Sequence, residues 1–248
     1  MSHGIVKIPL IPGRKEGSDR SEMVTQLLFG ELYTVLEEKE KWVFIENEAD
    51  GYQCWIDRKQ HNPIHADAYQ NVREAQHQLS TEILGETESG MRIPFGSKVN
   101  YSASPSISEI SNFKGDTARR QYADIETYAR LFLDAPYLWG GKSILGIDCS
   151  GFCQVVYSAC GIEIPRDAYQ QAEQGVTIEF LQEAKTGDLA YFDNKEGRIT
   201  HVGILLDRNE IIHASGKVRI DRIDHEGIYN EELKKYTHKL RIIKRINP

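Results

Sequence analysis

The sequence predicts an α+β protein of two domains, in which a small β-barrel is followed by a domain whose helices precede its sheet. Two observations carry this prediction. Short aromatic-rich strands joined by charged turns fill much of the first half of the chain. In the second half, apolar residues at helical spacing come first, and apolar runs broken by turn residues follow. We place the domains at 1–112 and 113–248.

The first domain contains a predicted β-meander between Glu31 and Asp57. Its strands are LYTVLEE, KWVFIENE and GYQCWID, and the pair Asp50-Gly51 suits a tight hairpin turn. Residues 61–82 are polar and partly helical, and residues 92–104 return to a strand pattern. Strands this short and this rich in aromatic residues favour a small barrel.

The second domain opens with the stretch ARRQYADIETYARLFLDAP, which predicts a helix that Pro136 stops. A second helix is predicted in GIDCSGFCQVVYSACG, starting at Asp148 and ending at Gly161. The runs DLAYF, HVGILLD, EIIHAS and KVRIDRI then predict a mainly antiparallel sheet. This order of elements is typical of an α+β domain.

Composition restricts the possible partners. The chain has 248 residues, 40% hydrophobic and 27% charged, with a formal net charge of -7 and no basic block. We therefore expect neither nucleic acid nor an anionic membrane as its main partner, and favour small molecules or peptides. The N-terminal residues lack the apolar core of a signal peptide, and no later run is long enough to span a membrane. These patterns predict a cytoplasmic location.

Cys149 stands at the start of the second predicted helix, where unsatisfied backbone N–H groups favour an anion. A thiol at this position is expected to have a lowered pKa, which suits a nucleophile. Asp148 has an ordinary role there as the N-cap. Cys153 and Cys160 lie further along the apolar stripe, so we expect them to be small buried side chains and all thiols to be reduced.

A thiol nucleophile needs a general acid and base, and histidine is the usual one. His201 and His213 lie on two apolar strands joined by DRNE, so a hairpin would bring them together. We expect His201 to act as the base toward Cys149 and His213 to orient it. The remaining histidines lie in polar contexts and are expected at the surface; they are His3, His61, His65, His77, His225 and His238.

These residues resemble those of the NlpC-type cysteine peptidases, which are papain-like bacterial cell-wall enzymes. The resemblance rests on PYLWGG, GIDCSGF, IEIPRDAYQQAEQG, GDLAYF, HVGILL and IIHASGKVRI, in that order. It implies a papain-like α+β catalytic domain and a catalytic triad of Cys149, His201 and His213. It also implies an oxyanion site made by the Cys149 backbone N–H and Tyr137, and a pocket lined by Trp139.

The N-terminal half is similar to the bacterial SH3-like domain that accompanies some of these enzymes, through SEMVTQLLFGE and DGYQCWI. Such two-domain enzymes are γ-D-glutamyl-L-diamino acid endopeptidases. The resemblance implies a murein tri- or tetrapeptide substrate with a free N-terminal L-alanine, as in cell-wall peptide recycling. It implies that Glu22, Tyr52, Asp148 and Ser150 bind substrate. One departure is Ala168, where the family often has a hydroxyl residue.

Three alternatives remain open at this level. A Cys-His site also serves an acyltransferase or amidase, because the acyl-enzyme is common to all three reactions. A non-catalytic peptidoglycan-binding protein is a second alternative, against which the retained cysteine and histidines argue. A metal site built from Cys149, His201 and His213 lacks the usual paired spacing of ligands. We therefore expect neither a metal nor another cofactor.

Overall fold

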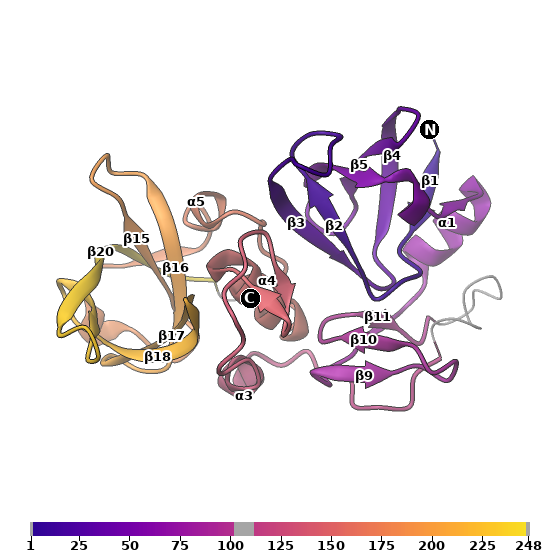
Figure 1. Cartoon of the computed structure of the whole chain (residues 1–248). Coiled ribbons are helices and arrows are strands. Elements are labelled where there is room, and N and C mark those ends of the chain that lie inside the picture. The colour runs from indigo at the N-terminus through magenta and orange to yellow at the C-terminus, as the bar shows by residue number, and fades with distance from the viewer. Residues whose placement is uncertain (1, 102–111, 247–248) are drawn as a thin grey trace. The chain divides into compact units, whose positions relative to one another are not determined.

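The computed structural model describes residues 2–101 and 112–246 of the chain. These residues form two compact units, which Figure 1 shows coloured along the chain. The first unit comprises Met1–Arg119 together with Trp139–Ile144, and the second comprises Arg120–Leu138 and Leu145–Pro248. The six-residue segment Trp139–Ile144, which shortly precedes the predicted helix at Cys149, is thus part of the first unit.

The first unit is built on an antiparallel sheet with strand order β3-β2-β6-β5-β4-β1-β7. The three strands expected between Glu31 and Asp57 are present, with Gly51 in the positive-φ conformation that the turn requires. The core of the sheet contains Val6, Ile11, Leu27, Tyr33, Val43, Ile45 and Ile56. The strands are β1 (His3–Ile5), β2 (Leu10–Arg14), β3 (Met23–Leu28), β4 (Leu32–Glu38), β5 (Trp42–Asn47), β6 (Gln53–Asp57) and β7 (Pro63–Ile64).

Shorter elements complete this unit. A 3-10 turn η1 (Arg58–Gln60) precedes the helix α1 (Ala66–Glu74), which lies in the stretch expected to be partly helical. The strand pattern expected at 92–104 is found only as β10 (Arg92–Pro94) and β11 (Lys98–Val99), while residues 102–104 lie outside the described ranges. The remaining strands are β8 (Gln78–Leu79), β9 (Leu84–Glu86) and β12 (Lys142–Ser143).

The second unit begins with helices, as predicted, but the first of them is short. A 3-10 turn η2 (Tyr122–Asp124) leads into α3 (Ile125–Arg130), and the chain leaves helical geometry well before Pro136. Asp134 adopts a positive φ of 66°, which an α-helix does not allow. The cysteine helix α4 (Cys149–Ala159) lies where predicted, and two short elements follow it: α5 (Ala168–Gln171) and η3 (Leu181–Glu183).

The sheet of the second unit differs from the prediction, because it closes into a ring. The four expected strands are present, and the structure adds three that the sequence analysis missed: β14, β19 and β20. Strand β20 pairs with both β15 and β19, so the six strands from β15 to β20 form a closed antiparallel barrel. The strands of this sheet are β14 (Val176–Ile178), β15 (Leu189–Asp193), β16 (Ile199–Leu205), β17 (Glu210–Ser215), β18 (Lys217–Ile223), β19 (Gly227–Asn230) and β20 (Lys235–Arg245). The short strand β13 (Gly146–Ile147) lies outside it.

The cysteine helix packs directly against this barrel. Helix α4 contacts β16, β17 and α3, and Figure 1 shows it beside the β16–β17 pair. Inside the barrel, Phe192, Leu205, Ile211, Ile223 and Ile243 form the apolar core. The first turn of the helix is therefore held against the strands that carry the two predicted histidines.

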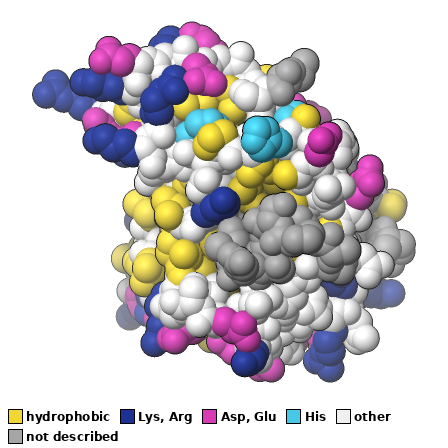
Figure 2. All heavy atoms as spheres, turned by 90° about the vertical axis from the view of Figure 1, so that its right-hand side faces the viewer, with side chains coloured by type: hydrophobic (Ala, Val, Ile, Leu, Met, Phe, Trp, Pro, Cys, Tyr) yellow, Lys and Arg dark blue, Asp and Glu magenta, His cyan; other side chains and the backbone are white. Residues whose placement is uncertain are grey.

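The surface shown in Figure 2 carries acidic and basic side chains interspersed with one another, with no large gathering of one sign among the described residues on that face. No helix in the described ranges is long and apolar enough to cross a membrane.

Candidate active site

The start of helix α4 places Cys149 at its first position. Asp148 has an extended backbone, and its side chain accepts a hydrogen bond of 2.7 Å from the Gly151 N–H, so it is the N-cap that the sequence predicts. Gly161 follows the helix with a positive φ of 83° and ends it. The Cys149 side chain is buried, with 5% of the residue exposed. Its sulfur accepts hydrogen bonds from the backbone of Val202, on β16, and of Ser150.

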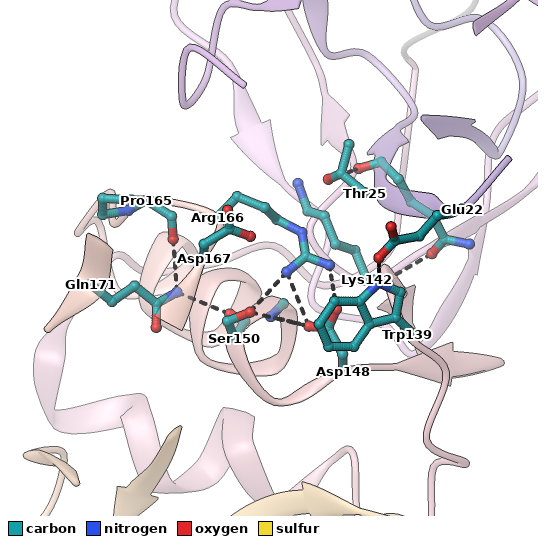
Figure 3. Close-up of polar contacts among 12 residues, drawn as sticks. Glu22, Thr25, Trp139, Lys142, Asp148, Ser150, Pro165, Arg166, Asp167 and Gln171 are labelled. Atoms are coloured by element: carbon teal, nitrogen blue, oxygen red, sulfur yellow. Dashed lines mark hydrogen bonds and ion pairs between the residues drawn. The ribbon is translucent and has the colours of Figure 1, made fainter. Parts of the chain in front are cut away.

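A buried arginine fixes the residues on both sides of the cysteine. The Arg166 guanidinium lies 2.6 Å from Asp148 Oδ2 and 3.0 Å from Oδ1, and it donates to Ser150 Oγ at 2.9 Å (Figure 3). Gln171 donates to the backbone oxygens of Ser150 and Pro165. Asp148 and Ser150, both predicted to bind substrate, are thus tied to Arg166, a residue to which the sequence analysis gave no role.

The two predicted histidines meet on neighbouring strands. His201 Nε2 and His213 Nδ1 are 2.8 Å apart and share a hydrogen bond. Gly203 faces His213 in the β16–β17 register, and a Cβ at that glycine would lie 2.8 Å from the His213 Cβ. A larger residue at Gly203 would therefore displace His213. The expected hairpin brings the two histidines together. The glycine of the motif HVG, Gly203, leaves room for the His213 ring.

The line of polar groups continues past His213. Its Nε2 lies 3.1 Å from Asp221 Oδ2, and Arg219 donates from Nη2 to Asp221 Oδ1 at 2.9 Å. Asp221 and His213 are both buried. Neither Asp221 nor Arg219 was among the residues predicted to form the site. The alternation in KVRIDRI contains a signal for them, because it places Arg219 and Asp221 on the same face of β18.

His238 contradicts the prediction of a surface histidine. It lies on β20, is partly buried, and stacks on His201 with ring centroids 4.1 Å apart and an interplanar angle of 22°. Ligand nitrogens of the three histidines lie within 4.8 Å of one another. Imidazole lone pairs lie in the ring plane, so the stacked rings of His201 and His238 direct theirs along nearly parallel planes and not toward one ion.

Burial controls the protonation of these groups. It raises the pKa of Cys149 to about 12, with a further contribution from Asp148, although Arg166 and the backbone N–H groups act in the opposite direction. The expectation of a lowered pKa at the helix start is therefore wrong. Burial also lowers the pKa of His201 well below its ordinary value, and to a smaller extent that of His213. At neutral pH the Cys149 thiol and the His201 imidazole are therefore both uncharged.

Tyr137, the second predicted oxyanion donor, comes twelve residues before Cys149 in the chain. It forms a bridge with Ile147, just before the helix, and is half-buried. Burial, followed by the nearby Cys149 and Asp148, raises the pKa of Tyr137 far above its ordinary value. Its hydroxyl is therefore protonated and able to donate a hydrogen bond.

The other predicted binding residues belong to the first unit. The exposed Trp139 donates from Nε1 to Glu22 Oε1 at 2.7 Å, so the structure brings these two predicted residues together (Figure 3). Tyr52 is half-buried at the Asp50-Gly51 turn, where its N–H donates to Asp50 Oδ1. Behind Trp139, the buried Lys142 lies 3.3 Å from Glu31, which anchors the segment Trp139–Ile144 in this unit.

Comparison with known protein families gives two matches. Residues 134–239 match the NlpC/P60 family, and residues 13–60 match the bacterial dipeptidyl-peptidase SH3 domain. A gamma-D-glutamyl-L-lysine dipeptidyl-peptidase from Bacillus subtilis is 31% identical, over 84% of this chain and 78% of the relative. The protein of the same name from Bacillus cereus is 30% identical, over 79% of this chain and 68% of the relative.

Among solved structures, an NlpC/P60 family protein from Bacillus cereus superimposes with a TM-score of 0.78 and covers all of both chains. Its sequence identity to this chain is 18%, so the likeness establishes the fold.

Proposed function

Because the chain belongs to the NlpC/P60 family of cysteine peptidases, we propose that it hydrolyses the bond between γ-D-glutamate and the diamino acid of murein peptides. The diamino acid is meso-diaminopimelate or lysine, and the substrate is a tri- or tetrapeptide with a free N-terminal L-alanine. The observation that carries the proposal is the hydrogen-bonded pair His201–His213, on strands packed against the helix that begins with Cys149. The relatives' names support the choice of bond.

In the proposed reaction, the Cys149 sulfur attacks the γ-carbonyl carbon of D-glutamate while His201 takes the thiol proton. The Cys149 backbone N–H and the Tyr137 hydroxyl donate hydrogen bonds to the oxyanion. His201 then returns the proton to the leaving amine, which leaves a thioester on Cys149. Water, deprotonated by His201, attacks the thioester carbon and releases L-Ala-γ-D-Glu, and His201 returns that proton to the leaving sulfur of Cys149. His213 orients the His201 ring throughout.

Selection for a free amino terminus needs a carboxylate that meets the substrate ammonium, because desolvating an unpaired charge is costly. Asp148 forms a buried ion pair with Arg166 at 2.6 Å, whereas Glu22 is exposed, accepts a hydrogen bond from Trp139 and has a longer ion pair, 3.7 Å, with the exposed Lys15. We therefore assign the ammonium to Glu22, with Trp139, which contacts Glu22, and Tyr52 as further binding residues. Because muramic acid acylates the stems of intact cell wall, this selection suits released peptides and a role in their cytoplasmic recycling.

The test compares free and N-acetylated L-Ala-γ-D-Glu-meso-diaminopimelate, and the lysine peptide, with release of L-Ala-γ-D-Glu followed by mass spectrometry. We expect cleavage of the free peptide by the wild-type protein and none by Cys149→Ala. N-acetylation, or Glu22→Gln on the free peptide, should reduce kcat/KM at least about tenfold, as expected for loss of a charge-assisted contact. Glu16→Gln is the control, because Glu16 is an exposed carboxylate of the same unit. Equal rates on free and acetylated peptides would overturn the assignment of Glu22.

A further inference from the structure

Four polar side chains form a continuous line across three adjacent strands of the barrel. They are His201 on β16, His213 on β17, and Asp221 and Arg219 on β18. In the β17–β18 register, His213 is opposite Arg219 and Ile211 is opposite Asp221, so both charged residues share the face of His213. The proposed reaction uses the two histidines and leaves Asp221 and Arg219 without a role.

A histidine in the orienting position has a difficulty that asparagine or aspartate would not have, because neutral imidazole exists as two tautomers. Since His201 Nε2 is hydrogen-bonded to His213, His201 has its Nδ1 left to accept the thiol proton. That nitrogen is bare only when the His201 proton is on Nε2, donating to His213 Nδ1. His213 must then carry its own proton on Nε2.

The opposite tautomer would be inactive. With a proton on Nδ1, His213 would donate to His201 Nε2, and the neutral His201 would then carry its proton on Nδ1. The base would face the thiol with an N–H group in place of a lone pair. The hydrogen bond between the two rings would have the same length in both cases, so ring geometry alone does not choose between them.

The far nitrogen of His213 makes the choice. Asp221 Oδ2 lies 3.1 Å from His213 Nε2, and an ionised carboxylate only accepts hydrogen bonds, so it selects the N–H on that nitrogen. Arg219 holds the carboxylate with one hydrogen bond, and its Nε lies 2.9 Å from Oδ2. Burial opposes ionisation of Asp221, but hydrogen bonds from His213 and Arg219 outweigh it and lower the pKa of the carboxyl group.

We propose that Asp221, held by Arg219, is a positioning residue that fixes the Nε2–H tautomer of His213 and thereby leaves His201 Nδ1 bare toward Cys149. This inference rests on the proposed function, since it assigns His201 as the base. In the line Arg219–Asp221–His213–His201 each hydrogen bond then has a fixed direction: His201 donates to His213, and His213 and Arg219 both donate to Asp221.

The test variant is Asp221→Asn, because an amide can either accept from His213 Nε2–H or donate to a bare Nε2. We expect kcat to fall about 10- to 100-fold with KM nearly unchanged, the range for partners that act through another residue's ring. Alkylation of Cys149 by iodoacetamide should slow by a similar factor. Imidazole ¹⁵N–¹H spectra should show the His213 proton on Nε2 in the wild type and partly on Nδ1 in the variant.

Asp188→Asn is the matched control. Asp188 is fully buried and pairs with Arg245 at 2.7 Å, in the same barrel but without contact to the histidines. The Asp188→Asn variant should be less stable than the wild type, with the His213 tautomer and the Cys149 alkylation rate unchanged. If Asp221→Asn does not fold, Arg219→Gln provides the second measurement, with a smaller shift in the same direction.

The outcomes separate the two proposals. A wild-type His213 protonated on Nδ1, or an Asp221→Asn variant with wild-type alkylation and an unchanged tautomer, would overturn the role of Asp221. Failure to cleave any murein peptide would overturn the proposed function. The spectra and the alkylation rates need no peptide substrate, so they would still decide the tautomer.

Discussion

Arg166 offers the sharpest test of how the cysteine helix is held. Its guanidinium makes three contacts of 3.0 Å or less to Asp148 and Ser150, and 1% of its side chain is exposed against 6% of that of Asp148. In Arg166→Met a side chain of similar length replaces the guanidinium, and the Asp148 carboxylate is left buried. Removing one partner of a buried ion pair costs about 3–5 kcal/mol, and we expect the second unit to lose that much stability.

The double variant Asp148→Asn/Arg166→Met isolates the charge. Asparagine still accepts the Gly151 N–H as an N-cap, but it carries no charge. We therefore expect the double variant to recover about 2 kcal/mol or more of the loss, since non-additivity of that size is normal for residues in one network. The control Arg222→Met removes an ion pair with the exposed Glu231 and should cost less than about 1 kcal/mol.

The assay must read each unit separately, because a two-unit chain need not unfold in one step. All three tryptophans, Trp42, Trp55 and Trp139, belong to the first unit, so their fluorescence does not report the second. Protection of buried thiols from alkylation reports on both units, because Cys54 is buried in the first unit and Cys153 in the second. Pulse alkylation across a urea series, read by mass spectrometry, gives a midpoint for each. An Arg166→Met loss below about 1 kcal/mol at Cys153, or no recovery in the double variant, would refute the reasoning.

Two further predictions follow from the buried groups. Because burial raises the pKa of Cys149 to about 12, the ultraviolet thiolate band that distinguishes wild type from Cys149→Ser should be missing at pH 7 and develop only in strong alkali; a full band at neutral pH would contradict this. Burial lowers the pKa of His238 from 6.5 to about 4, so as the pH falls this histidine is protonated in the unfolded chain before it is protonated in the folded chain. The free energy of unfolding should therefore decrease as the pH drops from 6.5 toward 4. His238→Gln should reduce this acid sensitivity, measured by Cys153 protection at pH 7 and pH 4.5, and an unchanged sensitivity would exclude His238 as its source.

Elements with a local signal were predictable from the sequence. The cap residue Asp148 and the closing Gly161 bound α4 as expected, because a helix N-cap and a C-terminal glycine act within one turn. The alternating apolar strands β15 to β18 and the charged link between His201 and His213 were equally readable. The pairing of the two histidines followed from that hairpin alone.

What the sequence did not reveal depends on contacts between distant segments. Strand β20 closes the barrel by pairing with β15 and β19, and register shifts interrupt both pairings. Such bulges disturb the alternation by which a strand is recognised. His238 was misassigned for this reason, since KYTHKLRIIKR looks polar until closure turns one face of it inward against His201.

The protonation state of Cys149 could not be predicted from its position at the helix start. The reason is the relative size of two free energies, that of the helix N-terminus and that of burial. A helix N-terminus stabilises an anion by about 0.3–1 kcal/mol, and by at most about 2 kcal/mol in buried geometries. A pKa raised from 9.0 to about 12 corresponds to about 4 kcal/mol against the thiolate, so burial outweighs the helix. The same burial lowers the pKa of His201, so in the proposed reaction His201 accepts the thiol proton only as a substrate is attacked. In the proposed reaction the helix start therefore acts on charge that forms as the bond is attacked, where donors already in position stabilise an anion most effectively.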